Sequence, residues 1–527
     1  MDNSVKIQKF DIPEKVSRVT SVLKNAGFEA YLVGGCVRDL FMGRKPKDWD
    51  VTTNAKPEEI IPLFSKTVYE NNFGTVAVVD DSGESMEDVV REEGSLVTHV
   101  TNESESLNSN SNDKLRDNSL KVIEITPYRI EGAYSDHRRP DSVKFSDKIE
   151  DDLKRRDFTI NSIAYDTDTG EIIDPFYGVA DLARGIIKTV GNPKDRFYED
   201  GLRILRAIRF HVELGFVIDP NTEKAILENN HILKSISKER IRDEFIKIIM
   251  SPNPSGGLEL MRKLGVLTYV IPELEDTIGI EQNKAHSYDV WTHLIKTVQH
   301  SADKGFPLHV RLSALFHDIS KPVSRRFDKE AKQWTFYGHE VIGSRVTKEI
   351  LENLKFSHET IERVSKLVRW HMFFSDTEQI THSAVRRMIS NVGKENVWDL
   401  INIRHCDRIG TGRPKENPYR LRKYQSMIEE VMADPISVGM LKVNGQRIME
   451  LLDVKPGPII GQILNALLEE ILDDPKLNTK EYLENRVIEL SKLPEGELKK
   501  MSEKGKEKRE KEEEKIIKQI RNKHFVA

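Results

Sequence analysis

The feature that most constrains the fold is a glycine turn, Gly34-Gly35, set between a strand pattern and a helix pattern. Residues 30–33 are apolar and rich in strand formers, and residues 37–42 place their apolar side chains on one helical face. Two carboxylates separated by one residue, Asp48 and Asp50, follow shortly afterwards. This order predicts strand, turn, helix and acidic pair, in a domain that mixes strands with helices.

The chemistry of these residues points to phosphate and metal. Paired glycines let a backbone approach a phosphate closely, and the amides at a helix start direct positive charge toward it. In an extended segment, residues i and i+2 face the same way, so Asp48 and Asp50 can share a divalent metal. Either feature alone is more typical of a plain turn or a solvated loop. Together they favour phosphoryl or nucleotidyl transfer.

Composition leaves a nucleic-acid partner open. The chain has 527 residues, enough for roughly three or four domains, and a formal net charge of −5. Residues 80–120 hold eleven acidic and three basic residues, so the remainder is slightly positive. This segment is rich in Ser, Asn and Glu and cannot bury a core, which predicts a flexible acidic insertion at a hairpin tip between strands at 74–79 and 122–126.

Two further observations concern the compartment. Only two cysteines occur, Cys36 and Cys406, which is typical of a reducing compartment rather than a disulfide framework. The N-terminus has no apolar segment of signal-peptide length, and no run approaches 18 apolar residues. We therefore expect a cytoplasmic protein with no membrane partner.

Adjacent arginines, Arg155-Arg156, precede a short apolar strand pattern. Guanidinium forks match phosphate oxygens, so this pair can clamp a triphosphate. A surface ion pair with Asp151 or Asp152 explains the pattern about as well.

From Phe197 onward the pattern is almost entirely helical, and it contains a polar stripe. At helical spacing the stripe comprises Asp200, Arg203, Arg206 and Arg209. An ordinary salt-bridged helix face is the simpler interpretation in isolation. The functional one rests on hydrogen bonding: a carboxylate accepts and an arginine only donates. Cytosine and adenine both offer an amino donor beside a ring-nitrogen acceptor, whereas guanine and uracil reverse that order. An Asp/Arg pair can thus select C and A.

With these residues in view, the chain resembles the class II nucleotidyltransferases, the family of CCA-adding enzymes and bacterial poly(A) polymerases. The matching segments, in the family's order, are residues 34–50, 155–161, 174–193, 199–210 and 239–245. The resemblance implies that Asp48 and Asp50 hold catalytic Mg²⁺ and that Asp200 and Arg203 read the incoming base. It also implies further nucleotide contacts from Gly35, Arg38, Arg156, Arg206 and Arg209. One metal would activate the 3′-hydroxyl of an RNA end, and the other would stabilise the triphosphate.

Two segments bear on which RNA end is extended. Residues 129–140 resemble the flexible loop that the family needs to switch from adding C to adding A. Residues 64–70 lack the basic-aromatic signature usual in bacterial poly(A) polymerases. The resemblance therefore favours addition of CCA to the tRNA 3′ end from CTP and ATP. Poly(A) synthesis and partial CC or A addition are the alternatives within the class.

A second set of residues resembles the HD phosphohydrolase domain. The run 311–322 contains His317-Asp318, and the resemblance implies that His293, His317, Asp318 and Asp407 are inner metal ligands. His339 and His371 are available to a second metal. Imidazole and carboxylate ligands together suit Mn, Fe, Ni or Mg. A degenerate HD fold kept as an RNA-binding scaffold is the alternative.

These expectations define an α+β protein with a small mixed sheet in its head and an all-helical remainder. The predicted segments are a nucleotidyltransferase head (14–175), a helical neck for base selection and RNA binding (176–280), an HD domain (286–410), a helical RNA-binding body (411–495) and a charged tail (496–527). Outside this class stand two alternatives: an HD phosphohydrolase with an RNA-binding head, and a non-catalytic RNA-binding protein. The Asp48/Asp50 pair argues against the latter. No oligomeric state is predicted.

Overall fold

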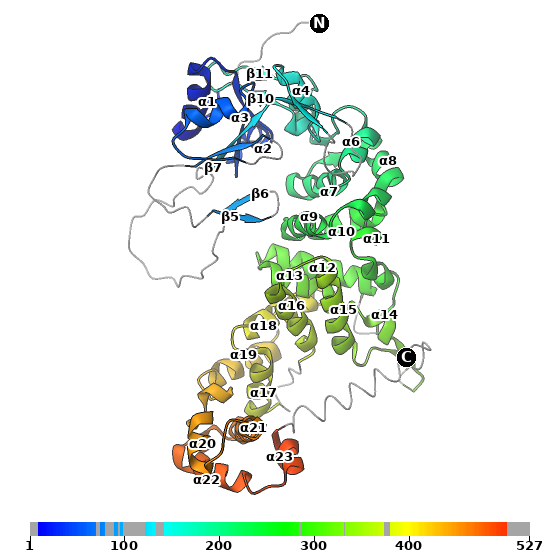
Figure 1. Ribbon diagram of the computed structural model, residues 1–527. Coiled ribbons are helices and arrows are strands. Elements are labelled where there is room, and N and C mark those ends of the chain that lie inside the picture. Colours follow the sequence, from blue (N-terminus) through cyan, green and yellow to red (C-terminus); the bar gives the residue numbers. More distant parts are fainter. Residues whose placement is uncertain are drawn as a thin grey trace. The chain divides into compact units, whose positions relative to one another are not determined.

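The structure is a computed structural model that describes residues 9–69, 74–79, 89–92, 95–98, 122–132, 142–283, 287–330, 332–373 and 380–502 (Figure 1). The chain forms two compact units, Met1–Ile236 and Ser237–Ala527. The division falls inside the predicted neck, residues 176–280. A mixed sheet lies in the first unit and helices dominate the second, which confirms the predicted α+β class.

A seven-stranded sheet forms the frame of the first unit, in the order β11-β10-β1-β2-β7-β4-β3. Its neighbours are antiparallel except for β2 and β7, which run parallel. The strands are β1 (Ala30–Val33), β2 (Trp49–Thr53), β3 (Thr67–Tyr69), β4 (Val76–Val79), β7 (Val122–Pro127), β10 (Ala164–Tyr165) and β11 (Ile172–Ile173). The predicted strands at 74–79 and 122–126 are thus confirmed as β4 and β7.

Strands β4 and β7 are direct neighbours, although the acidic insertion separates them in sequence. Val79 lies opposite Val122 in the antiparallel register. Within the insertion, β5 (Val89–Glu92) pairs with β6 (Ser95–Thr98) in a separate two-stranded ribbon. The prediction of a flexible insertion otherwise concerns residues outside the described ones.

Helices cover the sheet because their apolar faces pack against it. Val16, Val19 and Leu23 of α1 join Leu32 and Val51 of the sheet in one buried cluster. The helices of this unit are α1 (Glu14–Asn25), α2 (Gly35–Phe41), α3 (Pro57–Ile60), α4 (Ile149–Lys154), α5 (Gly178–Arg184), α6 (Pro193–Glu199), α7 (Arg203–Leu214) and α8 (Pro220–Asn229). Short 3-10 turns are η1 (Ile61–Leu63), η4 (Thr159–Asn161) and η5 (Asn230–Ser235). Two small ribbons complete it: β8 (Arg129–Glu131) with β9 (Val143–Phe145), and β12 (Ile186–Ile187) with β13 (Val217–Ile218).

In the residues that the structure describes, the second unit is built from helices and one hairpin. Its helices are α9 (Lys238–Met250), α10 (Pro254–Lys263), α11 (Leu267–Val270), α12 (Val290–Asp303), α13 (Leu308–Phe316), α14 (Lys321–Ser324), α15 (His339–Asn353), α16 (His358–Trp370), α17 (His382–Val392), α18 (Val397–Gly410), α19 (Tyr419–Val431), α20 (Gly445–Leu452), α21 (Pro458–Asp473), α22 (Lys480–Leu490) and α23 (Glu495–Ser502). The 3-10 turns are η6 (Pro272–Thr277), η7 (Val438–Met440) and η8 (Pro475–Leu477), and the hairpin joins β14 (Arg326–Asp328) to β15 (Gln333–Thr335).

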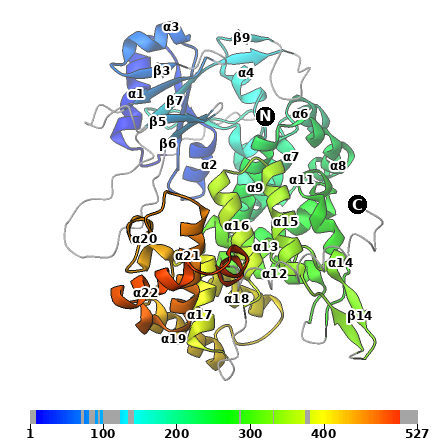
Figure 2. The same ribbon diagram turned by 60° about the horizontal axis from the view of Figure 1, so that its bottom comes forward.

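Two groups of helices matter for function in this unit. Helices α12, α13, α15, α16 and α18 pack against one another, and α17 and α19 to α22 gather around a second apolar core in the C-terminal part (Figure 2). Among the described residues, no helix has the length and apolarity that crossing a membrane requires.

Candidate functional site

The glycine turn of the first unit sits directly against an arginine and a carboxylate. Gly34 precedes α2 with φ of 83°, a conformation that side-chain-bearing residues rarely adopt. A Cβ at this position would lie 3.1 Å from Nη1 of Arg156 and 3.4 Å from Oδ2 of Asp50. Glycine is required here for both its backbone angle and its lack of a side chain. The turn therefore brings together three sequence segments that the chemistry of the site needs.

The acidic pair lies at the start of β2. Asp50 is a half-buried residue of the strand, and Asp48 is exposed just before it. Burial raises the pKa of Asp50 to about 6; the nearby Arg156 opposes the rise and the Asp48 carboxylate adds to it. The two carboxylates are therefore close enough to interact. A cation between them would stabilise the ionised form of Asp50 and lower its pKa again.

A third carboxylate shares the sheet face with Asp50. Glu124 of β7 is the register partner of Asp50 in the parallel β2–β7 pair, so the two side chains point to the same face from strands about 4.8 Å apart. Glu124 was not predicted from the sequence, because the insertion separates it from the glycine turn. Its signal was the alternation in β7, where Ile123 and Ile125 are buried and Glu124 between them is not.

Both predicted phosphate-clamp arginines are anchored by one buried carboxylate. Oδ1 of Asp152 accepts from Nη2 of Arg155 at 2.6 Å, and Oδ2 accepts from Nη2 of Arg156 at 2.9 Å. Burial acts to raise the pKa of Asp152, but the two guanidinium groups outweigh it and hold that pKa below its usual value. The ion pair with Asp152 considered from the sequence is present, and it fixes Arg156 beside Asp50 rather than excluding a phosphate role.

The predicted base-reading stripe is divided between a connection and a helix. Asp200 was expected on the same helix as the three arginines, but it lies between α6 and α7 with an extended backbone. Its Oδ1 accepts from the amide of Leu202 at 3.0 Å. This side-chain bond closes a local turn ahead of the helix, which begins at Arg203. The next residue, Gly201, lies against Ile232: a Cβ on Gly201 would come within 2.7 Å of Cγ2 of Ile232.

The arginines of α7 are buried or half-buried and well anchored. Nη1 of Arg203 donates to Oε2 of Glu199 at 2.6 Å, and its Nη2 donates to the carbonyl of Arg155 at 3.0 Å. Arg206 donates to Oδ2 of Asp157, with its Nη2 at 2.6 Å. The guanidinium of Arg209 lies over the Phe210 ring, 4.5 Å from its centroid. The three arginines therefore form a fixed set of donors on α7.

The second unit holds a compact cluster of imidazoles and carboxylates, all buried. Two groups each place one donor atom per residue within 4.8 Å of the others: His293 with His317 and Asp407, and Asp318 with His339 and His371. The six predicted ligands thus converge from helices α12, α15 and α18 and from the residues that follow α13 and α16.

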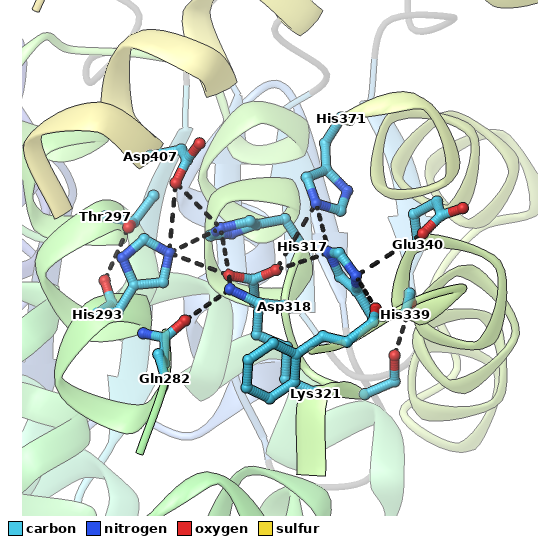
Figure 3. A network of polar contacts seen from close by, with 12 residues as sticks. Gln282, His293, Thr297, His317, Asp318, Lys321, His339, Glu340, His371 and Asp407 are labelled. Atoms are coloured by element: carbon cyan, nitrogen blue, oxygen red, sulfur yellow. Dashed lines mark hydrogen bonds and ion pairs between the residues drawn. The ribbon is translucent and has the colours of Figure 1, made fainter. Parts of the chain in front are cut away.

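Asp318, a member of the second group, lies at the centre of the cluster, between its own two histidines and the first group (Figure 3). Its Oδ2 is 3.2 Å from Nε2 of His293 and 3.3 Å from Nε2 of His317. Its Oδ1 is 3.1 Å from Nε2 of His339 and 3.7 Å from Nε2 of His371. The sequence could assign Asp318 only to the inner ligand set; the structure places one oxygen toward each group.

Charge in this cluster is balanced by protons, by Lys321 beside Asp318 and by Arg404 beside Asp407. Burial acts to lower the pKa of His317, but Asp318 and Asp407 outweigh it and raise that pKa to about 10. Burial lowers the pKa of His371 to about 4. Nζ of Lys321 lies 2.5 Å from Oδ2 of Asp318. Two carboxylates that hold His317 protonated offer the negative charge that a divalent ion needs, so the donor set fits a metal that would displace the proton.

A cavity of about 520 Å³ opens onto this cluster. It is lined by Asp318, His371 and Asp407, and also by Trp334, Tyr337 and Arg404. Nη1 of Arg404 donates to Oδ2 of Asp407 at 2.7 Å. A small charged molecule can therefore reach five of the six donor residues, all except His293, from one side.

The head fold with its carboxylates, glycine turn and arginines defines a nucleotidyltransferase. Residues 30–117 and 77–188 match the family model described as "Poly A polymerase head domain". Residues 215–278 match "Probable RNA and SrmB- binding site of polymerase A", and residues 325–487 match "tRNA nucleotidyltransferase domain 2 putative".

Relatives that match over most of the chain identify the family more narrowly. The chain is 32% identical to the CCA-adding enzyme of Ligilactobacillus salivarius, covering 90% of this chain and 96% of that one. It is 30% identical to the CC-adding tRNA nucleotidyltransferase of Thermus thermophilus, covering 86% and 92%. The solved CCA-adding enzyme of Bacillus stearothermophilus in complex with CTP matches with a TM-score of 0.61 at 25% identity, covering 91% and 97%. The chain belongs to the class II CCA-adding enzyme family of tRNA nucleotidyltransferases.

Proposed function

We propose that this protein adds C, C and A to the 3′ end of tRNA, from CTP and ATP, by Mg²⁺-dependent nucleotidyl transfer. The observation that carries the proposal is the meeting of Gly34, Asp50 and Arg156 at one point of the sheet. The relatives support it: the named bacterial enzymes add CCA or CC, and the solved neighbour binds CTP. Nucleotidyltransferases of this family use a divalent metal.

The roles follow from position and charge. Asp48 and Asp50 would hold the metal, and Glu124 would complete the carboxylate set on the same sheet face. A metal held there would supply activation of the 3′-hydroxyl and stabilisation of the leaving pyrophosphate. Gly35, Arg38 and Arg156 orient the phosphates: Gly35 and Arg38 lie on α2 directly after the glycine turn, and Arg156 lies beside Asp50.

Base selection is assigned to the start of α7. Asp200 accepts from the amino group of cytosine or adenine, and Arg203 donates to the neighbouring ring nitrogen. Arg206 and Arg209 help to hold the nucleotide from the same helix. Because Arg203 is fixed by Glu199 and by a backbone carbonyl, its donors are presented without reorganisation.

Incubation of the purified protein with tRNA lacking CCA, and with labelled CTP and ATP separately and together, tests the proposal. We expect CTP-dependent addition that ends after one A. Arrest after two C residues in the presence of ATP would assign the protein to CC addition instead, and long tails from ATP alone would assign it to poly(A) synthesis. Asp48→Ala should abolish all addition.

We also propose that the second unit is a metal-dependent phosphohydrolase. The specific observation is the pair of three-residue donor groups joined by Asp318. Imidazole and carboxylate donors suit Mn, Fe, Ni or Mg, and the cavity beside them admits a phosphate ester. In the alternative function, phosphate-ester hydrolysis is the protein's activity and the head serves only to bind RNA ends.

Metal analysis and phosphate-ester hydrolysis separate these readings. Protein dialysed against Mn²⁺ or Ni²⁺ should retain metal and hydrolyse p-nitrophenyl phosphate. His317→Ala should lose both, whereas Asp48→Ala should lose neither. A metal-free protein that hydrolyses nothing would instead support the degenerate HD scaffold.

We propose a cytoplasmic location, because both cysteines are free and buried thiols and because tRNA is the substrate.

A further inference from the structure

A chain of hydrogen bonds runs through the interior of the first unit. Nη1 of Arg38, on α2, donates to Oδ1 of Asn161 at 2.8 Å. Nδ2 of Asn161 donates to Oδ1 of Asp157 at 3.1 Å. Nε and Nη2 of Arg206, on α7, donate to Oδ2 of Asp157 at 2.8 Å and 2.6 Å. The chain joins the helix that follows the glycine turn to the helix that carries the base-reading arginine.

Asp157 and Asn161, the two middle residues of this chain, are held firmly by their surroundings. Asp157 is 8% exposed and Asn161 is 6% exposed. Oδ1 of Asp157 also accepts from the amide of Phe158 at 2.8 Å. Burial acts to raise the pKa of Asp157, but Arg206 and Arg203 outweigh it and hold that pKa well below its usual value. The buried pair of Asp157 and Asn161 holds one geometry, because each lost bond would leave a polar group unpaired in a low dielectric.

An aromatic ring joins the same two helices by a second route. The guanidinium carbon of Arg38 lies 5.2 Å from the centroid of Phe210, and that of Arg206 lies 5.6 Å from it. Phe210 is 3% exposed and packs edge-on against Phe158, with ring centroids 5.6 Å apart. Because Phe210 lies on α7, movement of this helix shifts the surface on which Arg38 rests.

We propose that Asn161 and Asp157 are positioning residues that couple base recognition on α7 to the placement of Arg38 against the triphosphate. This inference rests on the proposed nucleotidyl transfer. A correctly paired base holds α7 and Arg206 in place, and the network passes that geometry to Arg38. A wrong base disturbs Arg206, misplaces Arg38 and slows transfer itself, since such contacts act through orientation at the reacting atoms.

Single-turnover addition to tRNA lacking CCA tests the positioning role, with CTP and with UTP as the wrong base. Asn161→Leu removes both side-chain hydrogen bonds of Asn161 and keeps its branched shape. We expect its maximal rate with CTP to fall roughly tenfold, with a smaller fall for UTP, so that the preference for CTP narrows. Equal losses for both nucleotides would overturn the proposal.

A matched control comes from the same 3-10 turn. Oγ1 of Thr159 donates to Oδ2 of Asp181 at 2.7 Å, and Thr159 is 2% exposed, but it stands outside the network. Thr159→Val should lower the thermal midpoint as Asn161→Leu does and leave the CTP-to-UTP preference unchanged. A narrowed preference in Thr159→Val would show that any loosening of this turn suffices, and would overturn the specific role.

A double-mutant cycle measures the coupling directly. Arg38→Lys and Arg206→Lys should together cost less than the product of their single effects, by roughly fivefold, and this coupling should vanish in the Asn161→Leu background. Multiplicative effects in the parent, or undiminished coupling without Asn161, would overturn the proposal. The same cycle on CTP affinity requires no transfer. Failure of the parent protein to extend tRNA therefore counts against the proposed function alone.

Discussion

At the residue scale, Asp50 meets two opposing demands. It lies where burial raises its pKa to about 6, yet in its proposed role it is needed as a carboxylate. The opposing pull of Arg156 keeps the pKa from rising further, and bound metal would lower it again. Asp48, Asp50 and Arg156 could be predicted from the sequence, because each lies in a short motif whose residue types indicate metal or phosphate binding. Glu124 became visible only through strand register.

The titration of Asp50 predicts an acid limb in the rate of nucleotide addition. Below pH of about 6 the carboxyl is protonated and no longer holds a cation, so the rate should fall with decreasing pH. Because metal and proton compete, raising Mg²⁺ from limiting to saturating should move the midpoint to lower pH. Rates across pH at several Mg²⁺ concentrations check this. A midpoint that ignores Mg²⁺ would remove Asp50 from the metal site.

Gly34→Ala should abolish most addition at a modest cost in stability. The new Cβ crowds Arg156 and Asp50. The alanine must also keep the positive φ of Gly34, which costs about 1–2 kcal/mol of stability. Gly43 is the matched control: its φ is 65°, and a Cβ there would meet nothing within 4 Å. Both variants should lose similar thermal stability, but only Gly34→Ala should lose more than roughly tenfold in rate. Equal rates would show that crowding is harmless.

At the element scale, α7 shows where periodicity succeeds and where it fails. The apolar positions Leu205 and Ile208 are buried as the pattern predicts. Helical spacing also predicted Asp200 on this helix, whereas the helix begins at Arg203. The Asp200 side chain accepts from the amide of Leu202, and this local turn competes with the helix in a way that residue spacing does not reveal. The break leaves Asp200 with an extended backbone at the helix entrance.

Gly201→Ala should be destabilising, because Gly201 packs closely against Ile232. The added Cβ would lie 2.7 Å from Cγ2 of Ile232, and relief of such overpacking costs about 1–3 kcal/mol. Gly461→Ala offers the opposite case, because Gly461 lies inside α21 with nothing within 4 Å; there alanine should stabilise by about 0.5–1 kcal/mol. Thermal or denaturant unfolding of both variants measures the difference. A neutral Gly201→Ala would mean that the entrance of α7 can shift freely.

At the scale of the whole molecule, the two proposed chemistries occupy separate compact units. The carboxylates of the head belong to Met1–Ile236, and the six-residue cluster belongs to Ser237–Ala527. The sequence predicted both sets, because each resembles a known motif. It could not predict that Asp318 turns one oxygen to each group, since that depends on where five separate segments converge.

Separate units predict independent effects. His317→Ala should leave the rate of nucleotide addition within about twofold of the parent, and the Asp48→Ala and His317→Ala double variant should show each single defect unchanged. Metal at a hundredfold excess over its Kd should raise the free energy of unfolding of the second unit by about 2.7 kcal/mol. Its thermal midpoint should rise accordingly. Paired assays of addition and unfolding check both statements. Loss of addition in His317→Ala would contradict the separation.

The antiparallel pairing of β4 with β7 has a practical consequence for engineering. Since Val79 and Val122 already face each other, the sheet needs only a tight turn there, and an Asn-Gly turn could replace residues 80–121. A longer connection adds only a slowly growing loop-closure entropy. The head can therefore host a fluorescent reporter or an affinity handle at this edge while its strand order stays the same.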